Sequence, residues 1–344
     1  VALPAVYGTG SPKGNNAEMK TDGWELSLSW RDSFKLGGKP FDYSIKAMVW
    51  DSKSVITKYV NDTGSLGTVK GFIENGGSPS SYYVGMTVGE IWGYTVAGLF
   101  RDQADIDSSA IHDFVQASDK VTRPGQVKIA DLDGNGFIDP GNFAVDDHGD
   151  LRIIGNQSPR YRYGVNLSAR WNGIGLSVFL QGVGARDWYP GSDAGMFWGK
   201  YGRPFFALIP SIHNYTDDMY SAERNNWDTA YWPRMTTYQS NGTKNWTRLL
   251  EIPNTRYIQS AAYLRVKNIQ LDYSFPKHIC SAIRLQGLKI YVNAENLFTF
   301  TPLHKYAPNF DPEGLSYDSD FASAADGYTY PILKSVTVGV NITF

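Results

Sequence analysis

Hydrophobic and polar residues alternate along much of this chain, with the two-residue period of a β-strand. In the first such run, Trp24, Leu26, Leu28 and Trp30 are separated by polar residues. A strand with this period has one apolar face and one polar face. Comparable runs predict about eight strands, near residues 24–31, 43–49, 86–102, 163–171, 174–181, 269–275, 288–295 and 335–344.

The segments between these strands differ in length. The Asn172-Gly173 turn and the stretch 276–287 are short, whereas 103–157, 189–258 and 300–331 are long. A compact soluble domain rarely has several long loops, but outer-membrane barrels combine short periplasmic turns with long extracellular loops. Aromatic residues at strand ends also fit the interfacial girdles of a barrel. The pattern therefore predicts an all-β fold and favours an antiparallel transmembrane β-barrel over a soluble β-sandwich.

Composition narrows the class of protein further. Charged residues make up 19% of the 344 residues and the net charge is −2, which argues against a broad nucleic-acid-binding face. The single cysteine, Cys280, excludes an internal disulfide framework. No stretch approaches the roughly 18 apolar residues of a membrane helix, and barrel strands need none.

The sequence is expected to be part of a longer chain. It shows no signal peptide, and the opening Val1-Ala2-Leu3-Pro4 resembles the interior of a protein. Eight strands suffice for a small barrel, but the large loops suit a larger one. A separate piece of barrel would expose two unpaired strand edges to lipid, so the remaining strands are expected to come from outside this sequence.

A series of short motifs, in order along nearly the whole chain, resembles the SusC/RagA family of TonB-dependent outer-membrane transporters. Each motif is weak alone, and the specificity lies in the series. The motifs are Leu3-Pro4 with Gly8–Pro12, Asp22-Gly23-Trp24-Glu25-Leu26, Val88–Tyr94 with Ala97–Phe100, Pro124–Asp139, Ile154–Tyr161, Gln181-Gly182, Tyr263–Ile269, Tyr273–Pro276, Asn293–Phe298, Asp311-Pro312-Glu313 and the terminal Phe344.

The resemblance implies that residues 1–344 are the C-terminal part of one barrel domain, about the last eight strands of 22. The N-terminal plug and the earlier strands would lie outside this sequence. It also implies TonB-dependent nutrient import across the bacterial outer membrane, with a SusD-like surface lipoprotein as a lid and TonB as the energy source. An oligosaccharide cargo is favoured over a peptide. The expected partners are therefore this lipoprotein, TonB, the rest of the barrel, membrane lipid and the cargo, and not nucleic acid.

The acidic stretch 131–139 matches the first nine positions of a calcium loop. Asp131, Asp133 and Asn135 supply oxygens at positions 1, 3 and 5, and Phe137 and Asp139 hold positions 7 and 9. Position 12 is Asn142 instead of glutamate, for which Asp146, Asp147 or Asp150 would have to compensate. The loop predicts a structural Ca²⁺ or Mg²⁺, and the alternative is an acidic turn held by side-chain hydrogen bonds alone.

The longest loop is rich in aromatic residues that suit a sugar or peptide site, because flat rings stack on sugars and arginine binds hydroxyls or carboxylates. The alternative is that these residues pack the loop on itself or on a lid protein. The candidate substrate-binding residues are Trp198, Tyr201, Trp227, Tyr231, Trp232, Arg234 and Trp246.

No catalytic constellation stands out, so the sequence predicts a transporter and not an enzyme. The five histidines lack metal-ligand spacing, and no Gly-x-Ser-x-Gly motif occurs. The terminal strand ending in Phe344 resembles the insertion signal of outer-membrane barrels, although a soluble protein can also end on a strand. The alternative to transport is a soluble extracellular all-β glycan-binding protein or glycan hydrolase with a structural calcium loop.

Overall fold

Seven long antiparallel strands form one sheet in the computed structural model, in the order β1-β2-β7-β8-β11-β12-β13. The structure describes residues 17–59, 82–111, 122–142, 146–190, 194–201, 218–235, 252–315 and 332–344. The strands of this main sheet are β1 (Ala17–Leu36), β2 (Lys39–Tyr59), β7 (Arg160–Trp171), β8 (Ile174–Ala185), β11 (Tyr263–Ser274), β12 (Gly287–Phe300) and β13 (Ser335–Thr343).

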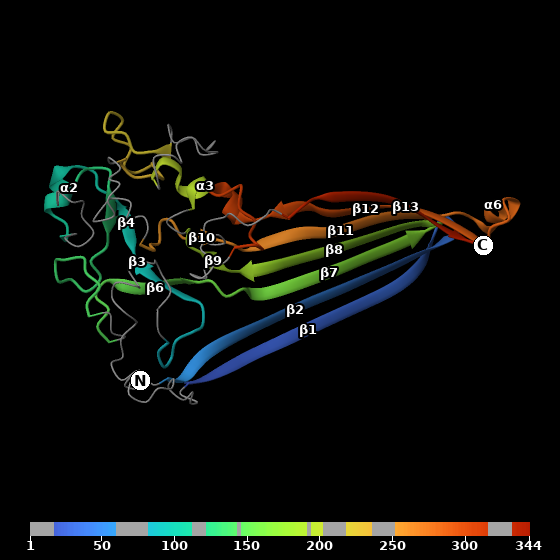
Figure 1. Cartoon of the computed structure of the whole chain (residues 1–344), viewed down its shortest axis with the longest axis horizontal. Helices are drawn as coiled ribbons and strands as arrows, with labels where there is room; N and C mark the ends of the chain where they lie inside the picture. The colour runs from blue at the N-terminus through green and yellow to red at the C-terminus, as the bar shows by residue number, and fades with distance from the viewer. Residues whose placement is uncertain are drawn as a thin grey trace, which may run out of the picture.

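The short connections all lie at one end of the main sheet, with the C-terminus (Figure 1). Gly37 and Gly38 join β1 to β2 with φ angles of 60° and 77°. Asn172 and Gly173 join β7 to β8 with φ angles of 47° and 86°, as a type I′ hairpin turn requires. This confirms the predicted Asn172-Gly173 turn. The helix α6 (Lys277–Ala282) fills the third short connection, between β11 and β12.

The long connections all leave the opposite end of the main sheet. They join β2 to β7 (60–159), β8 to β11 (186–262) and β12 to β13 (301–334), and each is wider than the loop predicted from sequence. Strand β2 pairs directly with β7 although about a hundred residues separate them. The predicted alternation of short and long connections is therefore confirmed.

The described parts of the long connections form a second region, the loop body, at the left of Figure 1. Short antiparallel pairs join β3 (Glu90–Tyr94) to β6 (Leu151–Asn156), β4 (Val96–Leu99) to β5 (Val127–Ile129), and β9 (Asp187–Trp188) to β10 (Gln259–Ser260). The short helices α2 (Gln103–Asp107), α3 (Gly195–Trp198), η2 (Gly199–Tyr201) and η4 (Pro302–Lys305) also belong to it. No helix among the described residues is long and apolar enough to cross a membrane.

The prediction of a long strand at 86–102 is wrong. These residues form β3 and β4, which pair with β6 and β5 in the loop body and not with the main sheet. All five residues of β3 are buried, so its aromatic residues pack inside a small core. The described residues accordingly contribute seven strands to the main sheet, where the sequence predicts about eight.

Candidate functional site: an apolar outer face, a polar inner face and a loop body

The strand register brings the hydrophobic positions of all seven strands onto one face of the main sheet. One row across the sheet runs from Leu28 through Ala47, Val165 and Leu180 to Val266. A second row crosses the strands nearer the C-terminus, where Leu271 opposes Val292 and Val292 opposes Val338. Their side chains are on the surface, since Leu28 is 61% and Val338 74% exposed.

This apolar face has the dimensions of a membrane-facing wall. The run from Trp24 to Phe34 spans roughly 33 Å along β1, or about 25 Å once tilted as barrel strands are. Seven strands span roughly 29 Å, so the face covers on the order of 900 Å². A soluble monomer rarely exposes more than a few hundred Å² of continuous apolar surface. In a β-sandwich a second sheet would cover this face, and no second sheet covers it within the described ranges.

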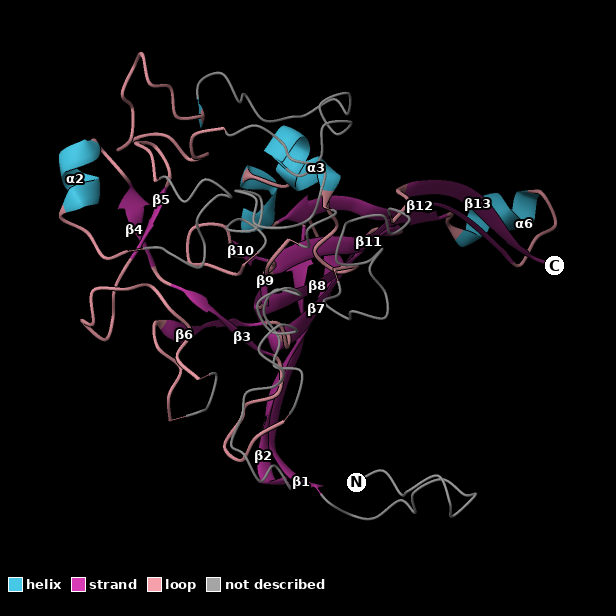
Figure 2. Ribbon diagram, turned by 60° about the vertical axis from the view of Figure 1, so that its left-hand side comes forward, coloured by secondary structure: helices cyan, strands magenta, loops and turns pink. Residues whose placement is uncertain are grey.

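The opposite face of the main sheet is polar. Ser44 and Ser168 are hydrogen bonded at 2.8 Å, and Asp272 lies 3.4 Å from Arg170 and 3.2 Å from Lys289. Figure 2 shows that the sheet bends between its β1 edge and its β13 edge. One apolar face, one polar face and this curvature are the features expected of a segment of barrel wall.

Near the loop body, the polar face is crossed by the segment 301–315. The buried Arg265 of β11 holds this segment through Asp311 and Glu313, each 2.6 Å from its guanidinium. Thr299 accepts a further bond from Arg265 at 2.9 Å, and Lys267 lies 2.8 Å from Glu313. Two motifs of the sequence series, one in β11 and one in the last loop, are therefore partners in space.

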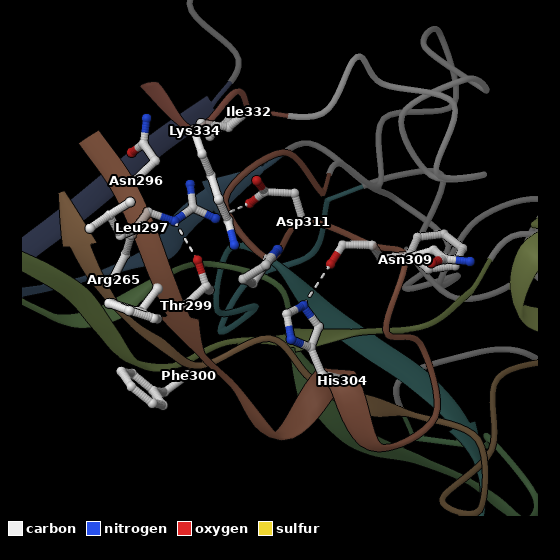
Figure 3. A pocket seen from close by; sticks show the side chains of 13 residues that line it. Arg265, Asn296, Leu297, Thr299, Phe300, His304, Asn309, Asp311, Ile332 and Lys334 are labelled. Atoms are coloured by element: carbon white, nitrogen blue, oxygen red, sulfur yellow. Dashed lines mark hydrogen bonds and ion pairs between the residues drawn. The ribbon is translucent and has the colours of Figure 1, made fainter. Parts of the chain in front are cut away.

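A pocket of about 390 Å³ opens beside this ion network (Figure 3). It lies where β12 continues beyond its last pairing with β13, between Glu295 and Ser335. Its size is that of a small-molecule subsite. Lys334 and Asn309 are its exposed polar groups, whereas Arg265 is neutralised by the carboxylates. Sequence reasoning missed this pocket because its walls come from three separate segments.

The predicted aromatic residues meet in the loop body, mostly as core. Trp198, Tyr201 and Trp232 are buried and pack on one another, with the rings of Tyr201 and Trp232 stacked at 5.4 Å. A buried ring offers no face to a sugar, so the packing interpretation replaces the binding one for these three residues. Tyr257, which the sequence analysis did not single out, is also in this cluster, and burial raises its pKa well above the ordinary range.

The other predicted loop residues are more accessible. Trp227 and Arg234 are partly buried, as is Tyr231, whose ring stacks on Tyr306 at 3.8 Å. Trp246 lies outside the described residues. These four therefore stay predictions as cargo contacts.

The acidic loop is folded around its own carboxylates. Asp131 accepts the amides of Gly134 at 2.6 Å and of Gly136 at 2.9 Å, which correspond to positions 4 and 6 of the calcium-loop pattern. The Gly136 amide is the main reason that the pKa of Asp131 is lowered. Asn135 and Asp139 bond to each other at 2.9 Å. The role of the Phe137 carbonyl as a ligand stays a prediction.

The structure adds Asp150 to this loop and gives it the central place. Oxygens of Asp131, Asp133 and Asp150 lie within 4.8 Å of one another. Asp150 is fully buried and accepts the amides of Leu132 at 2.6 Å and Asp139 at 3.1 Å. Burial raises the pKa of Asp150, and the neighbouring carboxylates raise it further. Of the three residues named as substitutes for position 12, Asp150 is therefore the one in place.

Comparisons with known proteins agree with this architecture. No family model matches the sequence. The chain is 24% identical over 350 residues to TonB-dependent receptor P3 and 22% identical to TonB-dependent receptor P26, both of Formosa agariphila. These matches cover 99% and 100% of this chain, but the chain spans only 30–31% of the relatives' length.

Solved structures show the same fold. The structure of the RagAB peptide transporter matches all of this chain with a TM-score of 0.60 and 16% identity, and the match covers 31% of that chain. The "open-open" state of the RagAB peptide importer matches with the same TM-score and 17% identity. At this identity the likeness concerns the fold.

The main sheet and the loop body are therefore similar to part of the TonB-dependent barrel transporters. These similarities support the SusC/RagA family that the motif series predicts, and the chain spans about a third of the length of the proteins it matches.

Proposed function

We propose that this chain is part of the wall and outer rim of an outer-membrane transporter that imports a nutrient with energy from TonB. One observation carries the proposal: a continuous exposed apolar face across seven strands, with every short turn at one end and every long connection at the other. The apolar face contacts lipid, the polar face lines the lumen, and the loop body lies outside the cell.

The rest of the proposed machine lies outside this sequence. Strand β13, ending beside Phe344, pairs on its free edge with a strand not contained here and closes a 22-stranded barrel. Phe344 is 83% exposed and acts as the insertion signal. A plug domain contacts TonB, and a SusD-like lipoprotein covers the loop body.

The cargo contacts are proposed at the outer rim, on the exposed groups of the pocket beside Arg265 and on Trp227, Tyr231 and Arg234. The sequence favours an oligosaccharide, but three of the aromatic residues behind that preference are buried. The RagAB structures are those of a peptide transporter. An oligosaccharide and an oligopeptide are therefore the two cargoes to compare directly.

We further propose that Asp131, Asp133 and Asp150 bind a structural Ca²⁺, with Mg²⁺ as the alternative. The three carboxylates, one of them fully buried, lie close together. A divalent cation bound between them would neutralise their negative charge. The cation would stabilise the loop body and take no part in chemistry.

The transport proposal is tested with the full-length gene in its host. The protein should fractionate with the outer membrane, and uptake of radiolabelled oligosaccharide or oligopeptide mixtures should be lost on deletion of either the gene or tonB. A protein found in the soluble fraction would contradict the proposal and favour the soluble glycan-binding alternative. Uptake that persists in the tonB deletion would contradict TonB as the source of energy.

A further inference from the structure

The short connection between β11 and β12 has features that a plain turn does not need. Pro276 precedes helix α6, and Cys280 is its buried residue, with Sγ 3.7 Å from the carbonyl of Phe275. Ile279 and Ile283 are one helical turn apart and face outward, 39% and 53% exposed. The connection therefore presents an apolar patch at the end of the main sheet where the C-terminus lies (Figure 1).

The charge around this patch is positive. No aspartate or glutamate occurs between Tyr273 and Ala294, whereas Lys277, Arg284 and Lys289 do. Lys289 pairs with Asp272 on the polar face, but Lys277 and Arg284 are exposed beside the isoleucines. An apolar patch flanked by exposed cations is typical of segments that lie in the interface of an anionic bilayer.

The helix ends in a Schellman motif with an unusual residue at its key position. Leu285 N–H donates to the Cys280 carbonyl at 2.9 Å, and Arg284 N–H donates to the Ser281 carbonyl at 3.0 Å. Arg284 has a φ of 59°, the left-handed conformation for which glycine is strongly favoured. Arginine has no advantage over glycine in this backbone conformation. Its presence there therefore indicates a use for the Arg284 side chain.

We propose that residues 276–286 form an interfacial anchor that binds the anionic phospholipids of the periplasmic leaflet of the outer membrane. Ile279 and Ile283 insert at the boundary between head groups and acyl chains, and Lys277 and Arg284 bind the phosphates. The apolar face of the main sheet continues up to residues 276–286, because the rings of Tyr273 and Phe275 pack with their centroids 5.0 Å apart at the end of β11. The inference rests on the proposed function, which puts the short turns at the periplasmic leaflet.

The first experiment measures depth in the full-length transporter, in nanodiscs of phosphatidylethanolamine and phosphatidylglycerol at three to one. Nitroxides are attached to Ile279→Cys and Ser281→Cys after Cys280→Ala and replacement of any other cysteine. The label at 279 should be several-fold more accessible to oxygen, relative to a water-soluble nickel chelate, than the label at 281. Equal exposure of both labels to the chelate would overturn the anchor, and so would a label at 279 immobilised and inaccessible to both quenchers, as in a protein interface.

Nitroxide labels on Val338→Cys and Thr337→Cys distinguish a failure of the anchor from a failure of the proposed barrel. If the 338 label is in lipid and the 279 label is not, only the anchor fails. If the 338 label is exposed to water, the barrel proposal itself fails.

The second experiment uses Arg284→Gly, which relieves the backbone strain while removing the cation. The variant should keep or raise the thermal stability of the full-length protein but lower its preference for retaining phosphatidylglycerol over phosphatidylethanolamine by about fivefold. Lys39→Gln, at the start of β2 and at the same end of the main sheet, is the matched control and should change the preference less. An unchanged preference in Arg284→Gly would contradict a head-group role.

Discussion

Val338 in the main sheet is 74% exposed, whereas Trp232 in the loop body is fully buried, although both are large apolar residues of one chain. The same difference separates the hydrophobic core from the main sheet. Of the buried residues in the described hydrophobic cluster, only Ile56 comes from a strand of the main sheet. The loop body supplies its own apolar environment, and in the proposed barrel lipid supplies that environment to the main sheet. The following variants test whether the two regions differ in this way.

The largest effect is expected for Trp232→Ala. This ring packs against Phe197, Trp198, Tyr201 and Tyr257, and its loss should destabilise the loop body by about 3–5 kcal/mol. Hydrogen exchange in detergent should show faster exchange in the loop body while the main sheet stays protected. Trp24→Ala, half-exposed on the apolar face, is the control and should leave the loop body unchanged. Simultaneous loss of both regions would mean that they are not separate folding units.

The next effect is expected for Val338→Arg, near the middle of β13. A cation at that depth in lipid should destabilise the folded barrel by about 2–4 kcal/mol. Urea unfolding in phospholipid vesicles measures the change. Thr337→Arg places the same cation on the polar face and should cost less than about 1 kcal/mol, so equal effects at the two positions would refute the assignment of the faces.

A smaller coupling is expected between Arg265 and Asp311, which link the main sheet to the loop body. A double-mutant cycle with Arg265→Gln and Asp311→Asn should give about 1–3 kcal/mol, because Arg265 is buried. The exposed Lys20–Asp22 pair, at a similar 2.9 Å, should give about 0.5 kcal/mol or less. If the two couplings were equal, burial would not distinguish the link from an ordinary surface pair.

The smallest change in stability is expected in the acidic loop. Ca²⁺ should raise the protease resistance of the loop body, and Asp150→Asn should weaken the apparent affinity by about tenfold or more. The exposed Asp146→Asn is the matched control and should bind nearly as the natural sequence does. If Ca²⁺ has no effect on the natural sequence, the loop is held by hydrogen bonds alone.

The same contrast explains which features the sequence could predict. In the main sheet each strand carries its own period-two pattern, and all seven strands lie where that pattern predicts them. In the loop body the residues 86–102 show a similar pattern, but their partners are 127–129 and 151–156, and no local signal reports such pairing.

The candidate sites follow the same rule. The spacing in 131–139 predicts a cation loop, but it cannot select Asp150, which reaches the loop only through the fold. Likewise, the motifs around Arg265 and Asp311 are visible in sequence, whereas their ion pair is visible only in space. Composition alone leaves both alternatives open for the aromatic residues, because it cannot separate a buried cluster from a binding surface.

The central claim is that the apolar face of the main sheet contacts lipid, and a cysteine scan along β13 tests it most directly. Single cysteines at 335–343 in the full-length protein, in intact cells, are treated with a membrane-impermeant maleimide and then with a lipid-soluble one. Positions 336, 338, 340 and 342 should react only with the lipid-soluble reagent, and the positions between them should be shielded from it. Reaction of positions 336, 338, 340 and 342 with the membrane-impermeant maleimide would contradict the account. Equal reactivity at every position along β13 would also contradict it.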